Sequence, residues 1–397
     1  MNIATRFVIT GRAILLSLLV SSAVAGEGPP ASIDPRGGEV PLGTQGGWDA
    51  YLVIDNDGVG VWRVDSAQVF PQYGSPEIVA LDDLGRCLVL VSYSGRWTPL
   101  ETVHDGKWLG GFAHGDIDPR IDGAETYVGS QKGNIYQVVG YDHGALDNRL
   151  IAHLTGREIH TIVGGDIDQS SDGTELIVFT RPGGLYRLRP TGEDGTWKTE
   201  HLQDLPGRVR DAVVLPAQAG DARGIATVSR TGRLELLQLT SEGPVWSTLY
   251  EGPMGKGRIA LGESRAGSPV VLYTTHDDGR VLRHEQQSAT RWETRTIYVG
   301  PQGPRGLATG RFDADPDVET VALFGYSGKV ELLSRDGQDW SAETIFLDKD
   351  KGHWLAAAEL DGRNGTRELL ASGYGGRVVM LTRPPGYGLS EPTTPRE

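Results

Sequence analysis

The chain has 397 residues, with 52 acidic and 38 basic side chains and a formal net charge of −14 at pH 7. Nucleic acids and anionic membrane surfaces repel such a chain, so neither is an expected partner. A single cysteine, Cys87, cannot form an internal disulfide, and the absence of CxxC pairs excludes cysteine-based zinc sites and covalent haem attachment. No P-loop or dinucleotide fingerprint is present, so neither a nucleotide nor a flavin is expected.

The N-terminal segment has the parts of a secretory signal peptide. Arg6 and Arg12 precede the apolar run AILLSLLV, and Ala23 and Ala25 supply a small-residue cleavage pattern. This run is too short to cross a bilayer, and no later segment reaches 18 apolar residues. Residues 1–25 therefore predict export to the periplasm or the extracellular space, with no transmembrane segment after cleavage.

The rest of the chain divides by composition into three parts. Residues 26–46 are rich in proline, glycine and polar side chains, and we expect a flexible leader there. Residues 47–384 carry a repeat and form the predicted folded domain, which we expect to be monomeric. Residues 385–397 have the composition of a disordered tail.

A repeated hairpin pattern runs through residues 47–384. Eight segments combine a β-rich run, a polar turn that ends in glycine, and a second β-rich run. From Gly133 onward the turn glycines are separated by 51, 48, 47, 49 and 48 residues, whereas the two intervals between Gly58, Gly95 and Gly133 are 37 and 38. A unit of this size cannot bury its own apolar face, so the copies must stack, and four strands per radially arranged unit make a β-propeller.

The better-preserved units also contain an inner strand of small apolar residues and an outer strand that carries a tryptophan. Trp197, Trp246, Trp292 and Trp340 recur at intervals of 49, 46 and 48 residues, in register with the repeat. A tryptophan that recurs once per unit indicates packing at the outer edge of a blade.

The number of blades follows from the span and from the ends of the repeat. The span divided by the period gives seven blades, and the count of hairpins gives eight. The last unit, 349–384, lacks a fourth strand, and residues 47–74 lack a clear inner strand. We therefore predict an all-β, seven-bladed propeller of four-stranded antiparallel sheets, in which N- and C-terminal strands share one blade, with eight blades as the alternative.

Two acidic loops stand between the first and second strands of their units. They read GDIDPRIDGAE (115–125) and GDIDQSSDGTE (165–175), and the repeat that contains them resembles the FG-GAP/VCBS type of exported propeller, in which such loops bind calcium. The resemblance implies the possible calcium ligands Asp116, Asp118, Asp122, Glu125, Asp166, Asp168, Asp172 and Glu175. Two extra residues separate the second and third acids, and the alternative is that these aspartates cap tight turns.

The starts of the inner strands form the candidate ligand site, because they share one face of a propeller. Aligned on the repeat, these positions are Glu77, Gly110, His160, Asp211, Arg258, Arg305 and His353, flanked by Lys107, Trp108, Arg157, Arg208, Arg210, Lys256 and Trp354. Arginines suit a carboxylate, and histidines suit acid–base chemistry near neutral pH. The alternatives are a metal held by the two histidines and Asp211, and a polar mouth without a ligand.

Two function classes follow from these residues. The first is a binding or scaffold module for a carbohydrate or an envelope or extracellular protein, with Glu77, Lys107, Trp108, Arg157, Arg258, Arg305 and Trp354 as ligand-binding residues. The second is a carbon–oxygen lyase or another carbohydrate-active enzyme, with His160, His353 and Asp211 as catalytic residues. IHTIVGGDID and GHWLAAAELDG resemble the propeller part of aldos-2-ulose dehydratase-like enzymes, although the chain has no room for the additional cupin domains of that family. The binding module is the favoured prediction.

Overall fold

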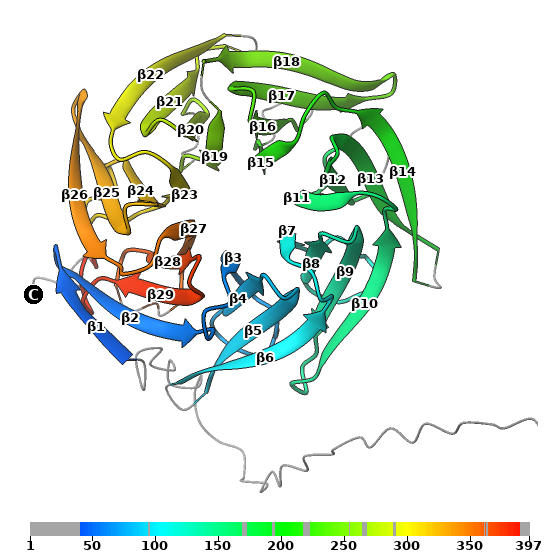
Figure 1. Ribbon diagram of the computed structural model, residues 1–397, viewed down its shortest axis with the longest axis horizontal. Helices are drawn as coiled ribbons and strands as arrows, with labels where there is room; N and C mark the ends of the chain where they lie inside the picture. The colour runs from blue at the N-terminus through cyan, green and yellow to red at the C-terminus, as the bar shows by residue number, and fades with distance from the viewer. Residues whose placement is uncertain are drawn as a thin grey trace, which may run out of the picture. The chain divides into compact units, whose positions relative to one another are not determined.

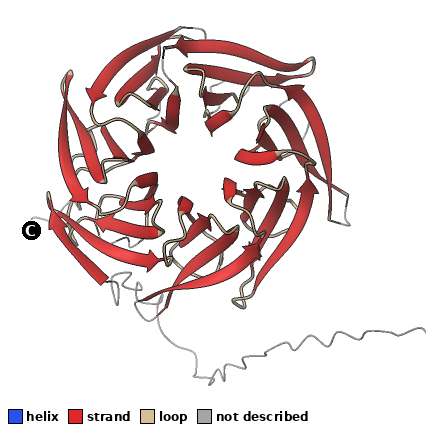
Figure 2. Cartoon of the chain, viewed as in Figure 1, coloured by secondary structure: helices blue, strands red, loops and turns tan. Residues whose placement is uncertain are grey.

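A computed structural model describes residues 40–389, except for 94–95, 169–172, 193–194, 217–222, 254, 264–267, 289–290, 361 and 363. Within these ranges every regular element is a β-strand, and no helix could span a membrane (Figure 2). The 29 strands of the described residues form seven antiparallel sheets around a central channel (Figure 1). The predicted all-β propeller of seven blades is therefore confirmed, and the alternative of eight blades is wrong.

The first six blades each take four consecutive strands, numbered from the channel outward in chain order. Blade 1 contains β3 (Val61–Ala67), β4 (Glu77–Asp82), β5 (Arg86–Tyr93) and β6 (Arg96–His104). Blade 2 contains β7 (Leu109–Gly115), β8 (Glu125–Ser130), β9 (Asn134–Gly140) and β10 (Leu146–His153). Blade 3 contains β11 (Glu158–Gly165), β12 (Glu175–Arg181), β13 (Gly184–Thr191) and β14 (Thr196–Asp204).

The next three blades continue this order around the ring. Blade 4 contains β15 (Val209–Val214), β16 (Ile225–Ser229), β17 (Arg233–Thr240) and β18 (Gly243–Glu251). Blade 5 contains β19 (Lys256–Leu261), β20 (Val271–His276), β21 (Arg280–Gln286) and β22 (Trp292–Val299). Blade 6 contains β23 (Pro304–Thr309), β24 (Thr320–Gly325), β25 (Lys329–Asp336) and β26 (Asp339–Leu347).

Blade 7 joins the two ends of the described chain. Its inner strands β27 (Gly352–Ala358), β28 (Glu368–Gly373) and β29 (Arg377–Thr382) come from the C-terminal side, and β2 (Trp48–Asp55) and β1 (Val40–Gln45) complete it from the N-terminal side. Strand β2 pairs with β29 from Asp49↔Thr382 to Asp55↔Arg377. The predicted shared blade is thus confirmed, whereas the flexible leader predicted for 26–46 was wrong over 40–45, because these residues pair with β2.

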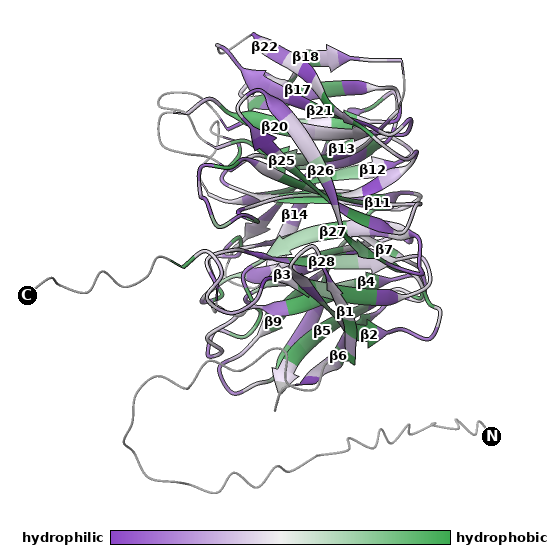
Figure 3. Cartoon of the chain, turned by 90° about the vertical axis from the view of Figure 1, so that its left-hand side faces the viewer, coloured by the Kyte–Doolittle hydropathy of each residue, from purple (hydrophilic) through white to green (hydrophobic). Residues whose placement is uncertain are grey.

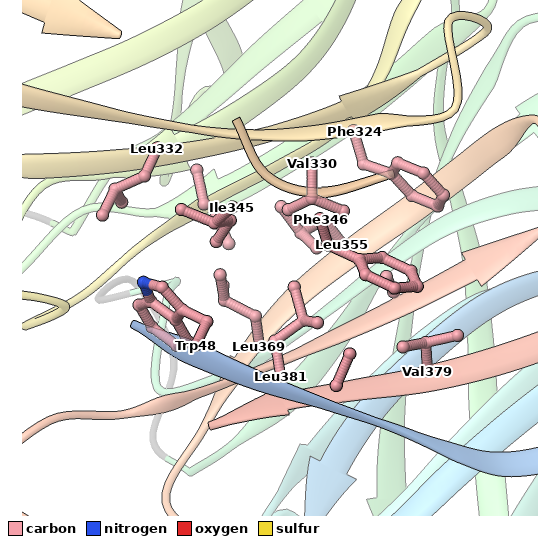
Figure 4. Close-up of a cluster of buried hydrophobic side chains, with 14 of the residues drawn as sticks. Trp48, Phe324, Val330, Leu332, Ile345, Phe346, Leu355, Leu369, Val379 and Leu381 are labelled. Carbon is pink, nitrogen blue, oxygen red and sulfur yellow. The ribbon is translucent and has the colours of Figure 1, made fainter. Parts of the chain in front are cut away.

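The closing strand is held by a buried cluster between blades 6 and 7. Trp48 on β2 is fully buried and belongs to a cluster that contains Phe324, Phe346, Leu369 and other apolar residues of β24–β29 (Figure 4). Its indole lies edge-on to Phe312, with ring centroids 6.3 Å apart. The guanidinium carbon of Arg383 lies over the same indole, 4.5 Å from its ring centroid.

Apolar clusters of the same kind fill the spaces between the other blades. The four periodic tryptophans lie on β14, β18, β22 and β26, and each packs against one of these clusters, as the sequence predicts. In Figure 3 the outer strand β22 is mostly polar, whereas β5 carries strongly hydrophobic segments. The core is therefore divided among the contacts of adjacent blades.

The glycine spacing becomes regular once the blades are known. Gly58 connects β2 to β3, and Gly95 lies outside the described residues, between β5 and β6, so neither marks the turn between a second and a third strand. In blade 1 that turn is at Gly85 (φ 80°), which lies 48 residues before Gly133. The misplaced turns also explain why Glu77 was wrongly predicted to begin an inner strand, since it begins β4.

We predict that Trp48→Ala destabilises the ring by about 3–5 kcal/mol, because truncation of a fully buried tryptophan leaves a cavity at the closure. Urea denaturation would show the midpoint shift. Val40→Ala is the matched control on the neighbouring strand, since Val40 is 57% exposed, and it should leave the midpoint unchanged. Equal effects of the two variants would contradict a closure that depends on Trp48.

Candidate functional site

Every inner strand carries a β-bulge close to its start. The pairing of each inner strand with the second strand shifts register at this point, which leaves one extra residue per blade. The residues at the bulges are Trp62, Gly110, His160, Arg210, Arg258, Arg305 and His353. All seven line one cavity of about 290 Å³ at the mouth of the channel, so the bulges define the site.

One side of this cavity is cationic. Arg208 and Arg210 come from blade 4 and the turn before it, Arg230 from the β16–β17 turn, and Arg258 and Arg305 from β19 and β23. We call these five residues the arginine arc. Asp277 joins two of them, with 3.0 Å contacts to Arg210 Nη1 and to Arg305 Nη1. Among the described residues no ion pair joins the other three to a carboxylate.

The opposite side of the cavity is aromatic. The aromatic arc runs through His160, Trp108, Trp62, His353, Tyr374 and Tyr326. Trp62 and Trp108 stack at 5.3 Å with planes 24° apart, and His353 stands edge-on to Trp62 at 4.5 Å. The two arcs meet at Tyr326, whose hydroxyl accepts a 3.0 Å hydrogen bond from Arg305 Nε. The site thus offers flat apolar surfaces facing a row of guanidinium groups.

The two histidines of the aromatic arc are neutral at physiological pH. Burial and nearby guanidinium groups lower the pKa of both His160 and His353 to about 3. His353 Nδ1 lies 2.7 Å from the backbone oxygen of Trp62, and since a carbonyl only accepts, Nδ1 carries the proton. In this tautomer His353 Nε2 is a hydrogen-bond acceptor.

Trp354 contacts the arginine arc at Arg258. The guanidinium of Arg258 lies 4.2 Å from its ring centroid, and that of Arg63 lies 4.4 Å from it. Both contacts are cation–π interactions, which hold two like charges next to one indole. Arg258 is consequently a partly buried cation held beside an indole, and desolvation is the main cause that lowers its pKa to about 10.

The structure brings together most of the residues predicted for the mouth. His160, His353, Arg258, Arg305, Trp108 and Trp354 line the cavity, together with Gly110, Arg208 and Arg210. Asp211 does not line it, because the bulge gives that place to Arg210. The Asp211 carboxylate is buried and accepts hydrogen bonds from the backbone N–H groups of Ile259, at 3.2 Å, and Ala212.

Three further predicted ligand-binding residues lie outside the cavity lining. The Glu77 carboxylate accepts hydrogen bonds from Val69 N and Phe70 N, at 2.8 and 3.1 Å, and so holds the end of the inner strand. Lys107 is exposed in the turn before β7. Arg157 binds Asp204, with Nη2 at 3.2 Å from Oδ1.

Four cavity residues were missed by the sequence analysis. Trp62 was missed because the first blade was out of register. Arg230, Tyr326 and Tyr374 each stand two residues before a turn glycine, as Asp277 does. This shared position next to Gly232, Gly328, Gly376 and Gly279 is a signal that the sequence contains.

The acidic loops engage arginines and backbone amides. Asp118 binds Arg120, with 2.5 Å between Nε and Oδ1, and Asp168 binds Arg187 and Arg189. Glu125 and Glu175 accept backbone N–H groups at the ends of their inner strands. Asp116, Asp122 and Asp166 are exposed, and Asp172 lies outside the described residues.

This donor set does not fit a calcium shell of six to eight oxygens, because arginines already neutralise the buried aspartates. Among the described residues no group of three or more acidic, histidine or cysteine side chains is arranged to hold a metal. Of the two alternatives that the sequence left open for these loops, the contacts of the described residues favour a role without calcium.

Comparison with known proteins identifies the fold. No protein family and no curated protein matches the sequence. The WD40 β-propeller domain of Doa1 matches with a TM-score of 0.57 at 12% identity over 86% of this chain and 97% of its own. The β-propeller domain of Cps50 (Swd1) from Myceliophteria thermophila matches with a TM-score of 0.55 at 11% identity over 86% of this chain and 99% of its own.

A third solved structure, YCF48 bound to D1 peptide, has a TM-score of 0.57 at 12% identity over 88% of this chain and 97% of its own. At these identities the matches support the propeller fold alone. The resemblances to FG-GAP/VCBS repeats and to dehydratase-like enzymes stay predictions.

We predict that His160 makes stability pH-dependent. Its folded pKa of about 3 lies below the ordinary histidine value of 6.5, so the unfolded chain binds the proton first and the folded state loses stability as pH falls below about 6.5. Between pH 7 and pH 5 the free energy of unfolding should fall by about 2 kcal/mol more in the wild type than in His160→Gln. Urea denaturation at both pH values measures this difference. Parallel pH profiles of the two proteins would contradict a neutral buried His160.

We also predict that removal of calcium leaves the melting temperature unchanged. The buried aspartates of the loops are neutralised by Arg120, Arg187 and Arg189, so a chelator has no bound cation to remove. Thermal melting with EDTA and with added calcium tests this. A rise in the midpoint with calcium, lost in Asp166→Asn, would show instead that the loops bind the ion.

Proposed function

We propose that the chain is a binding module and that its channel mouth binds an acidic carbohydrate. The uronate carboxylate would lie on the arginine arc, and the sugar ring would lie against the aromatic arc. The observation that carries this proposal is five arginines on one side of a cavity whose other side is aromatic. The volume of about 290 Å³ is close to the lower end for small-ligand pockets.

The charge of the arginine arc is the main argument for an anion. Asp277 contacts Arg210 and Arg305, while Arg208 has Arg210 and Arg230 as neighbouring cations, opposed by Glu158. Burial, together with these neighbouring cations, lowers the pKa of Arg208. A carboxylate relieves this repulsion and accepts two parallel hydrogen bonds from one guanidinium. A local cationic surface in a chain of net charge −14 therefore favours an anionic ligand.

The titration of the histidines favours binding over lyase chemistry. A general acid or base works best when its pKa is near the working pH. Both His160 and His353 have a pKa of about 3, and the third predicted catalytic residue, Asp211, lies behind the cavity lining. Neutral histidines suit hydrogen bonding to sugar hydroxyls. The predicted export of the chain would also place it where acidic polysaccharides occur.

We predict that trigalacturonate binds to the purified protein and that galactotriose, its uncharged counterpart, does not. Arg208→Gln and Arg230→Gln should each weaken trigalacturonate binding at least tenfold, about 1.4 kcal/mol, because each removes a cation without breaking an ion pair among the described residues. Isothermal titration calorimetry measures both affinities, and binding should weaken with added salt.

Arg295→Gln is the matched control, since Arg295 is exposed on the outer strand β22 and should not affect binding. Equal binding of the charged and uncharged sugars would overturn the role of the arginine arc. Binding of inorganic phosphate with the same affinity as trigalacturonate would show that the mouth recognises an anion without a sugar. An acidic peptide that binds more tightly than trigalacturonate would identify a protein partner instead.

A further inference from the structure

The interfaces between blades have an equivalent position near the end of each outer strand. The residue at this position pairs with the second residue of the third strand of its blade. The pairs are Leu234↔Tyr250, Val281↔Tyr298 and Val330↔Phe346. In blades 4, 5 and 6 the residue at this position is therefore aromatic. In blade 3 the pairing is Leu185↔Gln203, so a glutamine stands where the next three blades have a ring.

Tyr298 shows what the aromatic residue does. It reaches from blade 5 to blade 6, and its hydroxyl donates a 2.8 Å hydrogen bond to Glu331 Oε1. The space left between these blades, lined by Tyr298, Glu331 and their neighbours, is only about 10 Å³. The phenol therefore fills this interface and satisfies a carboxylate there.

The interface between blades 3 and 4 has the same backbone and lacks the ring. Glu235 is the register equivalent of Glu331, since Thr227↔Glu235 corresponds to Leu323↔Glu331 in the next strand pairing. With Gln203 in place of the tyrosine, a cavity of about 370 Å³ is open there, lined by Leu205, Val209, Glu235 and Trp246 among others. Trp246 Nε1 donates a 2.8 Å hydrogen bond to Gln203 Oε1, which engages the glutamine with this indole.

The carboxylate of Glu235 can accept a further hydrogen bond. Among the described residues its one ion pair is with Arg233, and the distance from Glu235 Oε1 to Arg233 Nη1 is 3.9 Å. Arg233 is closer to Glu251, with 3.4 Å between Nε and Oε1. Burial raises the pKa of Glu235, with Arg233 opposing and Glu251 adding to this effect. The cavity thus presents a partly buried carboxylate where blade 6 presents one to a phenol.

We propose that this cavity is a binding site for a 4-hydroxyphenyl group, whose ring takes the place that Tyr298 has between blades 5 and 6 and whose hydroxyl donates to Glu235. The site lies between blades 3 and 4 and does not rest on the function proposed for the channel mouth. The 4-hydroxyphenyl group can belong to a free phenol or to a tyrosine side chain of another protein chain.

The test uses p-cresol, which is the side chain of tyrosine, and toluene, which lacks only the hydroxyl. By calorimetry or NMR titration, p-cresol should bind with a stoichiometry of one and at least tenfold more tightly than toluene. Gln203→Tyr fills the cavity from within and should abolish binding. Glu235→Leu keeps the cavity but removes the acceptor, and should reduce the affinity for p-cresol to that for toluene.

Tyr298→Ala provides an independent test, because it opens the equivalent interface in blades 5 and 6. This variant should bind two molecules of p-cresol, and Glu331→Leu in the same background should reduce the affinity of the second site alone to that for toluene. Glu331→Leu in the otherwise wild-type protein is the matched control and should leave p-cresol binding unchanged. These variants keep the proposal falsifiable if Gln203→Tyr does not fold.

Equal affinities for p-cresol and toluene would overturn the proposal, and so would unchanged p-cresol binding in a folded Gln203→Tyr variant. N-acetyltyrosinamide separates the two sources of the ring. If it competes with p-cresol, the site admits a tyrosine of another chain, and if p-cresol alone binds, the site takes a free phenol. Either result supports recognition of the 4-hydroxyphenyl group.

Discussion

The structure depends on the pairing of β2 with β29. Each blade buries its apolar faces only against its two neighbours, so an open ring would expose two of these faces to water. The β2–β29 ladder and the burial of Trp48 between blades 6 and 7 remove both exposed faces at once. The convergence of seven inner strands on one channel, and with it the shared mouth, follows from this closure.

The mouth combines a repeated backbone with side chains that do not repeat. One bulge per inner strand directs one residue per blade to the same cavity, whatever that residue is. The side chains then divide the ring into a cationic part on blades 4 to 6 and an aromatic part on the remaining blades, which Tyr326 of blade 6 joins to Arg305. The repeated backbone thus places one residue of each blade at the mouth, and the differences among these seven side chains determine which ligands the mouth can bind.

The sequence predicts the fold better than the site, for physical reasons that particular residues show. A period near 48 and the recurring tryptophans depend on packing between blades, which every copy must satisfy, so the middle blades were predicted correctly. Blade 1 was misread because its turn glycine, Gly85, lies in a short turn between two strongly apolar strands, while Gly58 and Gly95 have more conspicuous polar turns. Asp211 was placed at the strand start, with Arg210 only beside it, because an extra residue in a strand shifts every later side chain, and strand alternation alone does not reveal a bulge. The open interface at Gln203 also needed the strand register, since only the pairing shows which residues are equivalent.

The bulge positions have a consequence for how such a site diverges over time. A residue at a bulge lies outside the regular ladder, so exchanging it changes the chemistry of the mouth while the core packing of its blade stays intact. The exchanges are nevertheless not independent. At Gly110 any side chain would collide with the ring of Trp108, which leans over it. A lineage that gains a functional group at position 110 must therefore first give up or move the neighbouring indole, and the order of mutations decides which ligand specificities are accessible.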